Sequence, residues 1–191
     1  MDKIIIFYAH PDKEGLHGYI LEELKNNLKE KKQEYEIIDL YEKKYDPILK
    51  YEELYSRGRR QIDKTTEYYQ NLIKNNRLFV FIYPTWWQNM PAVLKGFFDR
   101  VFTGGFGFTY QHGLPVPMLK GKKAAVFSGS GGPRLYGYLI GNPSTKAVAK
   151  HLLAFCGFKT KRFHIWRANR LDDKKKEALK KIAGKISTYL Q

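Results

Sequence analysis

The sequence has few of the features that build disulfide-linked or membrane-spanning proteins. It contains one cysteine, Cys156, so no intramolecular disulfide can form. No apolar run approaches the roughly 18 residues that a membrane-spanning helix needs. The first stretch, MDKIIIFYAHPD, has an apolar run too short for a signal peptide and no small-residue cleavage site. We therefore expect a cytoplasmic protein. Because Cys156 lies in the apolar stretch LLAFCGF, we expect its thiol to be buried and structural.

Acidic residues are also scarce. The chain has 19 Asp and Glu against 34 Lys and Arg, a net charge of +15. Such an excess can indicate nucleic-acid binding. However, most lysines fall in helix-like stretches with interspersed acids, such as LEELKNNLKEKKQE, which is typical of a solvated helix face. We expect no nucleic-acid partner, and a positive field that attracts anionic small molecules such as phosphorylated cofactors.

Hydrophobic residues make up 43% of the 191 residues, which is enough for one sizeable core. Neither an internal repeat nor a linker interrupts the chain, so we expect a single domain over residues 1–191. Continuous apolar runs predict buried strands at 3–9, 35–40, 77–84, 123–129 and 159–166. Helical periodicity predicts helices at about 15–33, 63–75, 91–102, 143–156 and 172–190, the third with Pro91 at its first helical position. Segment 41–62 is expected to be a loop with a helical turn or two, and 103–122 a long loop.

Alternating strands and helices predict a parallel sheet with helices on both faces. Five strands in this length match the flavodoxin-like doubly wound order 2-1-3-4-5. A Rossmann fold is disfavoured, because the first strand is followed by AHPDKEGLHG rather than by G-x-G-x-x-G.

Three unusual loops follow strands one, three and four, namely residues 10–18, 84–90 and 128–137. In an open α/β sheet, ligands bind beyond the carboxyl ends of strands near the point where the strand order reverses. The first loop precedes a helix N-terminus, which favours phosphate, and His10 and His17 could add hydrogen bonds. The alternative is that each histidine is only a loop or capping residue. The third loop, SGSGGPRLYG, is rich enough in glycine to bring backbone donors close to a ligand.

The second loop, PTWWQNM, combines two tryptophans with two amides. A flat heteroaromatic ligand needs an aromatic wall and donors for its polar edge, and this loop offers both. The alternative is that Trp86 and Trp87 are core residues beneath the loop.

The chain resembles the flavodoxin-like NAD(P)H:quinone oxidoreductases, which include mammalian quinone reductases and bacterial general-stress and potassium-efflux ancillary reductases. The resemblance covers nearly the whole chain and rests on YAHPD, YPTWWQNMPAVLKGFFDRVF, GFGFTY, SGSGGPRLYG and FCGF. It implies a tightly bound FMN or FAD, and ping-pong hydride transfer from NAD(P)H to a quinone or similar acceptor. It also implies a homodimer that completes the site across its interface, for which the aromatic and arginine-rich segment 41–62 is a candidate. The alternative is that this segment is only an exposed loop with long side chains.

The resemblance also implies roles for individual residues. The flavin phosphate end would lie at His10, Gly15, Leu16 and His17, and the isoalloxazine ring at Pro84, Thr85, Trp86, Trp87 and Gln88. A second flavin-edge loop would comprise Gly129, Ser130, Gly131 and Gly132. Phe108 and Tyr110 would line the substrate side. Tyr136 matches a family tyrosine near the flavin carbonyl edge. Our own hypothesis is that Tyr136, together with Asn142, orients the flavin's polar edge during catalysis. No metal is implied.

Three residues depart from the family pattern. The usual serine or threonine of the first loop is Gly15, and the usual asparagine is His17. Asn142 stands where mammalian members carry a histidine, so a proton relay through that histidine cannot apply unchanged.

Two other functions fit the resemblance less well. A regulatory subunit of a membrane potassium-efflux transporter would suit the positive charge, through an acidic partner or the anionic inner leaflet. A one-electron carrier is disfavoured, because such carriers usually have a hydroxyl-rich phosphate loop and an acidic surface.

Overall fold

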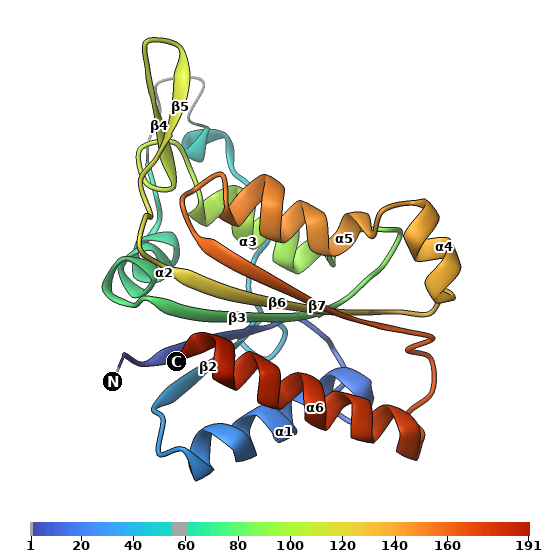
Figure 1. Cartoon of the computed structure of the whole chain (residues 1–191). Coiled ribbons are helices and arrows are strands. Elements are labelled where there is room, and N and C mark those ends of the chain that lie inside the picture. The colour runs from blue at the N-terminus through green and yellow to red at the C-terminus, as the bar shows by residue number, and fades with distance from the viewer. Residues whose placement is uncertain (1, 55–60) are drawn as a thin grey trace.

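A five-stranded parallel sheet forms the centre of the computed structural model, which describes residues 2–54 and 61–191 (Figure 1). In spatial order its strands are β2 (Tyr35–Asp39), β1 (Ile4–Tyr8), β3 (Leu78–Pro84), β6 (Lys123–Ser130) and β7 (Lys159–Trp166). All four pairings are parallel. Counted along the chain within this sheet, the order is 2-1-3-4-5, so the predicted sheet is confirmed.

Helices pack against the sheet from two sides (Figure 1). One side carries α1 (Leu16–Glu30) and α6 (Asp173–Leu190). The other carries α2 (Lys64–Asn75), α3 (Ala92–Val101) and α5 (Pro143–Lys146). Side chains of β1 alternate between the two layers, as the pleat requires: Ile5 and Phe7 join the cluster that contains α3 residues, and Ile4 and Ile6 join that of α1 and α6.

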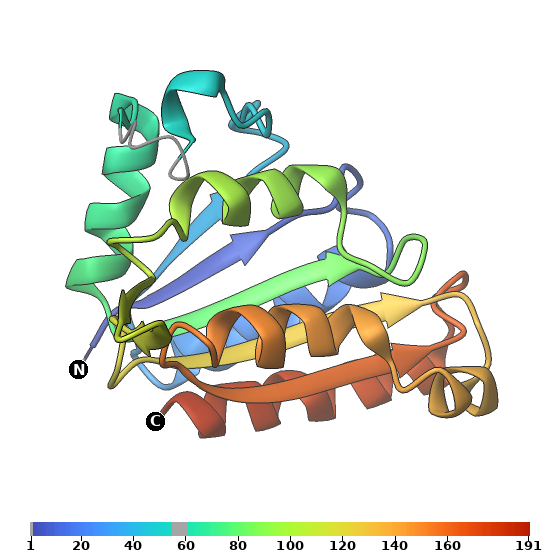
Figure 2. The same cartoon turned by 90° about the horizontal axis from the view of Figure 1, so that it is seen from above.

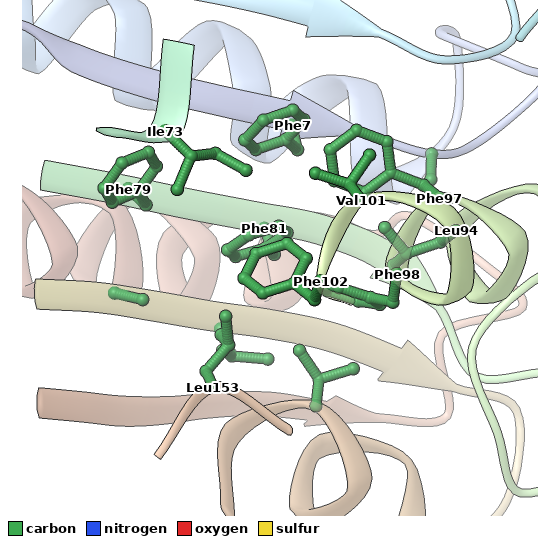
Figure 3. Packing of buried hydrophobic residues seen from close by; sticks show 14 of the residues in the cluster. Phe7, Ile73, Phe79, Phe81, Leu94, Phe97, Phe98, Val101, Phe102 and Leu153 are labelled. Carbon is green, nitrogen blue, oxygen red and sulfur yellow. The ribbon is translucent and has the colours of Figure 1, made fainter. Parts of the chain in front are cut away.

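Aromatic side chains dominate the packing under α3 (Figure 3). The rings of Phe7 and Phe81 stack with centroids 5.1 Å apart, and Phe97 of α3 lies 4.8 Å from Phe7. Each of these large side chains is fully buried, which contributes on the order of 2–3 kcal/mol per residue. The strands that lead to the predicted ligand-binding edge are therefore held by a dense core.

The predicted loop at 103–122 contains a β-hairpin instead. Strands β4 (Phe108–Gln111) and β5 (Leu114–Pro117) pair antiparallel, and they project at the end of the molecule opposite α4 (Figure 1). Their two-residue connection, His112 and Gly113, has φ of 50° and 78°, as a type I′ turn requires. In the sequence, the dipeptide His-Gly between the short runs FTYQ and LPVP could have indicated this hairpin.

Three further elements differ from the predictions. Helix α4 (Arg134–Leu139) follows the glycine-rich stretch, and the predicted helix at 143–156 is α5 followed by η3 (Ala147–Leu153), a π-helix. Apolar spacing does not distinguish these hydrogen-bonding patterns. Pro91 is the N-cap of α3 and not its first helical residue. In segment 41–62 one 3-10 turn is seen, η1 (Tyr51–Glu53), and residues 55–60 of that segment lie outside the described residues.

Two compositional expectations can be compared with the structure. Cys156 is buried, as predicted, and burial raises the pKa of its thiol to about 12. Lysines on the helices pair with acids one turn away, as in Lys25–Glu22 and Lys180–Glu177. Across the described ranges, none of the helices is both long and apolar enough to cross a bilayer.

A buried arginine ties the loop after β2 to α3. Arg100 is 2% exposed and donates hydrogen bonds to Glu53 and Asp63, at 2.8 Å and 2.6 Å from Nη2. Its Nη1 also donates to the carbonyl of Asp46 at 2.7 Å. Since the Glu53 carboxylate is itself buried, it depends on Arg100 for its compensating charge.

Replacing Arg100 with methionine should lower the free energy of unfolding by about 3–5 kcal/mol, because it leaves a buried carboxylate unpaired. Urea denaturation measures the change. The matched control is Lys95→Met on the same helix, whose exposed pair with Asp99 should contribute less than about 1 kcal/mol. Equal effects of the two substitutions would show that the buried cluster does not stabilise the fold.

Candidate ligand-binding site

The carboxyl ends of β1, β3 and β6 bring the three unusual loops together at one edge of the sheet (Figure 2). Backbone pairing continues beyond the strands, because the N–H of Thr85 donates to Gly129 O at 2.8 Å. The hydroxyl groups of Thr85 and Ser128 also form a short hydrogen bond. These contacts fix the second loop against the third.

A pocket of about 400 Å³ lies between the loops. Most of its lining residues were predicted: His10, Gly15, Leu16, His17, Pro84, Thr85, Trp86, Gly129 and Gly131. Others were not predicted: Asp12, Ala168, Asn169 and Leu171. The last three follow β7, whose backbone joins the third loop where Ala168 N–H donates to Ser130 O at 2.8 Å. Because β7 is parallel to β6, its carboxyl end lies at the same edge, and this topology was the missed signal.

Two histidines stack at the wall of the pocket. The rings of His10 and His17 are nearly parallel, with centroids 4.8 Å apart. His10 Nδ1 accepts a hydrogen bond from the backbone N–H of Asp12 at 3.0 Å, so this residue also stabilises the loop turn. His17 is 6% exposed, and its Nε2 has no partner in the described part of the chain. Burial, with a smaller contribution from His10, lowers the pKa of His17 to about 3.

The start of α1 faces the same pocket. Its N-cap is Gly15, which supplies no side-chain hydrogen bond to the first turn. Backbone N–H groups at a helix N-terminus favour an anion, and here no side chain of the N-cap competes for them. The Asp12 carboxylate is turned to the loop, where it accepts from the N–H of Glu14 at 2.7 Å. An unpartnered His17 Nε2 beside these amides fits a phosphate group.

The two tryptophans lie in a tight turn and not in the core. Trp86 and Asn89 exchange both backbone hydrogen bonds at 2.9 Å. Between them Trp87 and Gln88 have φ of 49° and 61°, which defines a type I′ turn. Non-glycine residues in this conformation cost about 1–2 kcal/mol each. Trp86 is 42% and Trp87 99% exposed, so the core alternative is wrong for both.

The third loop closes on its neighbours through its glycines and Tyr136. A side chain at Gly131 would collide with Asn169, whose Oδ1 lies 2.3 Å from the position of a Cβ. Gln88 Nε2 donates to the Tyr136 hydroxyl at 3.4 Å, which links the tryptophan turn to α4. Behind the loop, Ser130 Oγ lies 3.0 Å from Nε2 of His164. His164 was not predicted. The parallel pairing of β7 with β6 places it next to this loop.

Three predicted residues lie elsewhere in the chain. Phe108 and Tyr110 belong to β4, and their rings make an edge-to-face contact at 5.7 Å. The hairpin lies at the opposite end of the molecule from α4 and the turn after β3 (Figures 1 and 2). Asn142 is the left-handed N-cap of α5 and lines a different cavity, together with Arg134 and Lys146.

Residues 2–190 match the model of the family described as flavodoxin-like fold, and the chain belongs to that family. Over 191 aligned residues it is 29% identical to an uncharacterised NAD(P)H oxidoreductase of Haemophilus influenzae, covering 96% of this chain and 93% of the relative.

Solved structures give the same result. The NAD(P)H:quinone oxidoreductase of Methanothermobacter marburgensis is 26% identical with a TM-score of 0.84, covering 99% of this chain and 96% of that one. The FMN-dependent NADH-azoreductase of Bacillus anthracis str. Ames Ancestor, solved in complex with FMN, is 20% identical with a TM-score of 0.75 and coverage of 100% and 99%, which shows a shared fold. The predicted resemblance to NAD(P)H:quinone oxidoreductases is confirmed.

Acid should destabilise the protein through its buried histidines. Burial lowers the pKa of His17 to about 3 and that of His164 to about 4, against about 6.5 in the unfolded chain. At a pH between the folded and unfolded pKa values, each histidine is protonated in the unfolded state and neutral in the folded state. The free energy of unfolding therefore falls as pH decreases below about 6.5, by up to about 1.4 kcal/mol per pH unit for each histidine.

Urea unfolding of the wild type and of His164→Gln from pH 7.5 to 5 measures this slope. The substitution should make the slope shallower, whereas His151→Gln at an exposed position should not change it. Identical slopes in all three proteins would contradict the expected contribution of His164.

Proposed function

We propose that the protein is a flavin-dependent NAD(P)H oxidoreductase that reduces quinones or similar acceptors. The observation that carries the proposal is the pocket at the carboxyl edge, where an unpartnered His17 Nε2 and the open start of α1 face the strained tryptophan turn across about 400 Å³. The names of the relatives support the same reaction class. A quinone oxidoreductase of M. marburgensis shares the fold at 26% identity.

The flavin is FMN in this proposal, with its phosphate at the first turn of α1. The uncapped N–H groups after Gly15 and the Nε2 of His17 would hold the phosphate oxygens. A bound dianion beside His17 favours the imidazolium form, so binding would raise the pKa that burial lowers. The azoreductase of the same fold was solved in complex with FMN, which supports the choice of FMN in this proposal.

The isoalloxazine ring would lie along residues 84–88. In this position the exposed indoles of Trp86 and Trp87 supply apolar surface, and Gln88 and the Tyr136 hydroxyl supply polar groups at the ring edge. When bound, the flavin would supply the hydride-transfer chemistry between NAD(P)H and the acceptor. The chain positions these partners and polarises the flavin edge, with Tyr136 held towards it by Gln88.

A second copy of the chain would complete the substrate side. Within one chain, the hairpin whose strand β4 carries Phe108 and Tyr110 lies at the other end of the sheet from the loops after β3 and β6 (Figures 1 and 2). The hairpin exposes Tyr110 at 55% and Leu114 at 69%, an apolar surface available to a partner. Sedimentation should give a mass near twice the 22.4 kDa of one chain, and a monomer at all concentrations would contradict this arrangement.

Purified protein loaded with FMN should oxidise NAD(P)H when a quinone is supplied. Trp87→Ala should weaken FMN binding about tenfold, the equivalent of about 1.4 kcal/mol of ring contact, and should lower turnover at subsaturating FMN. The matched control is Tyr68→Ala, which removes a half-exposed aromatic from α2.

Absorbance titration measures flavin binding, and NAD(P)H consumption measures turnover. A protein that takes up no flavin would refute the proposed function. Full flavin content and turnover in Trp87→Ala would refute the placement of the ring along the tryptophan turn.

A further inference from the structure

A second cavity, of about 710 Å³, lies beside α4. It is lined by a different face of α4 from the one that carries Tyr136, the residue that contacts the tryptophan turn. Its walls come from α4, the start of α5 and η3, and the edge strand β7. On α4, Arg134, Gly137 and Tyr138 line this cavity, whereas Tyr136 faces Gln88 of the candidate flavin site. The cavity is therefore distinct from the pocket described above. We call it the β7 groove.

The β7 groove is strongly cationic. Arg134, Lys146, Lys150 and Arg162 all line it, and none of the lining residues is acidic. Within the described ranges, no ion pair involves any of these four side chains, although many other lysines of the protein do have acidic partners. Lys161 also lines the groove, but its ammonium group lies over the rings of Phe163 and Tyr189. It is therefore not included among the cations that could contact a ligand in the groove.

Two polar groups in the wall of the groove lack partners. Thr145 is 1% exposed, and its hydroxyl group has no hydrogen bond to any described residue. Nδ1 of His164 is likewise buried without a partner, while Nε2 of the same ring contacts Ser130. A buried hydroxyl without a partner is costly, and Thr145 lines the same cavity as the four cations. A ligand that carries acceptor oxygens would satisfy both.

The shape of the groove also fits a ligand with an aromatic part. Its volume exceeds that needed by a phosphate group alone and lies within the range of small-molecule sites. Tyr138 is 83% exposed, and the ring of Trp166 packs closely over Gly137. These rings offer apolar surface to a base, and arginine, lysine and hydroxyl donors suit phosphate oxygens.

We propose that the β7 groove binds a nucleoside diphosphate, with its phosphates between Lys146, Lys150 and the Thr145 hydroxyl. This site is separate from the proposed flavin pocket and does not depend on it. The ammonium group of Lys146 lies at the wall of the groove, because its Nζ is 3.4 Å from the position that a Cβ on Gly141 would occupy. Four positive charges complement the two to three negative charges of a diphosphate.

Calorimetric titration with ADP tests the proposal, with adenosine and inorganic pyrophosphate as separate probes. The wild type should bind ADP at least tenfold more tightly than adenosine, and pyrophosphate should bind more tightly than adenosine. The groove variant is Lys146→Ser/Lys150→Ser. Its matched control is Lys174→Ser/Lys181→Ser, which removes two exposed lysines from α6 on the other side of the sheet.

The groove variant should lose ADP affinity at least tenfold, and the control variant should change it less than twofold. A loss confined to the groove variant also excludes the pocket of the 10–18 loop as the place where ADP binds. Thr145→Val should weaken ADP binding three- to tenfold without lowering the urea midpoint, since the hydroxyl has no partner in the free protein.

Three outcomes would overturn the proposal. Equal losses in the groove and control variants would show that general surface charge holds ADP. Adenosine binding as tightly as ADP would show that the phosphates are not recognised. A DNA duplex that binds more tightly than ADP and weakens equally in both double variants would assign the charge to nucleic acid instead.

Discussion

The pairing of β3 between β1 and β6 is the constraint on which the rest of the site depends. Parallel register sets Tyr8 beside Ile82, and Pro84 beside Gly129, so the segments that follow start at one edge. The apolar residues of the strands hold this register, because burying both faces of the sheet is what stabilises the parallel arrangement.

The surroundings of the edge divide into rigid and strained parts. The buried Arg100 cluster and the stacked phenylalanines hold α3 and the strands in place. On that support the chain maintains a type I′ turn with Trp87 and Gln88 at positive φ, although neither residue favours it. Strain of this kind persists where the surrounding structure fixes it and is common at ligand sites. The turn is accordingly the part of the edge that we assign to ligand contact.

The strands could be predicted because each is a continuous apolar run in the sequence. Their order could be predicted because strands and helices alternate regularly along the chain. The exposure of the tryptophans could not be predicted, because the sequence is equally consistent with Trp86 and Trp87 as core residues. Their exposure results from the turn geometry, which the structure alone shows. Similarly, apolar spacing could not separate an α-helix from the π-helix η3. Asn169 and His164 were missed because their place in the site comes from the pairing of β7 with β6, which local sequence does not record.

The most direct test of the account compares FMN with riboflavin, which lacks the phosphate, in the wild type and in His17→Ala. If the phosphate lies at α1 and His17, the substitution should weaken FMN binding about tenfold and leave riboflavin binding unchanged. His151→Ala, at an exposed position away from the pocket, should affect neither ligand. Equal loss of both flavins, or no loss of either, would contradict a phosphate site at this edge.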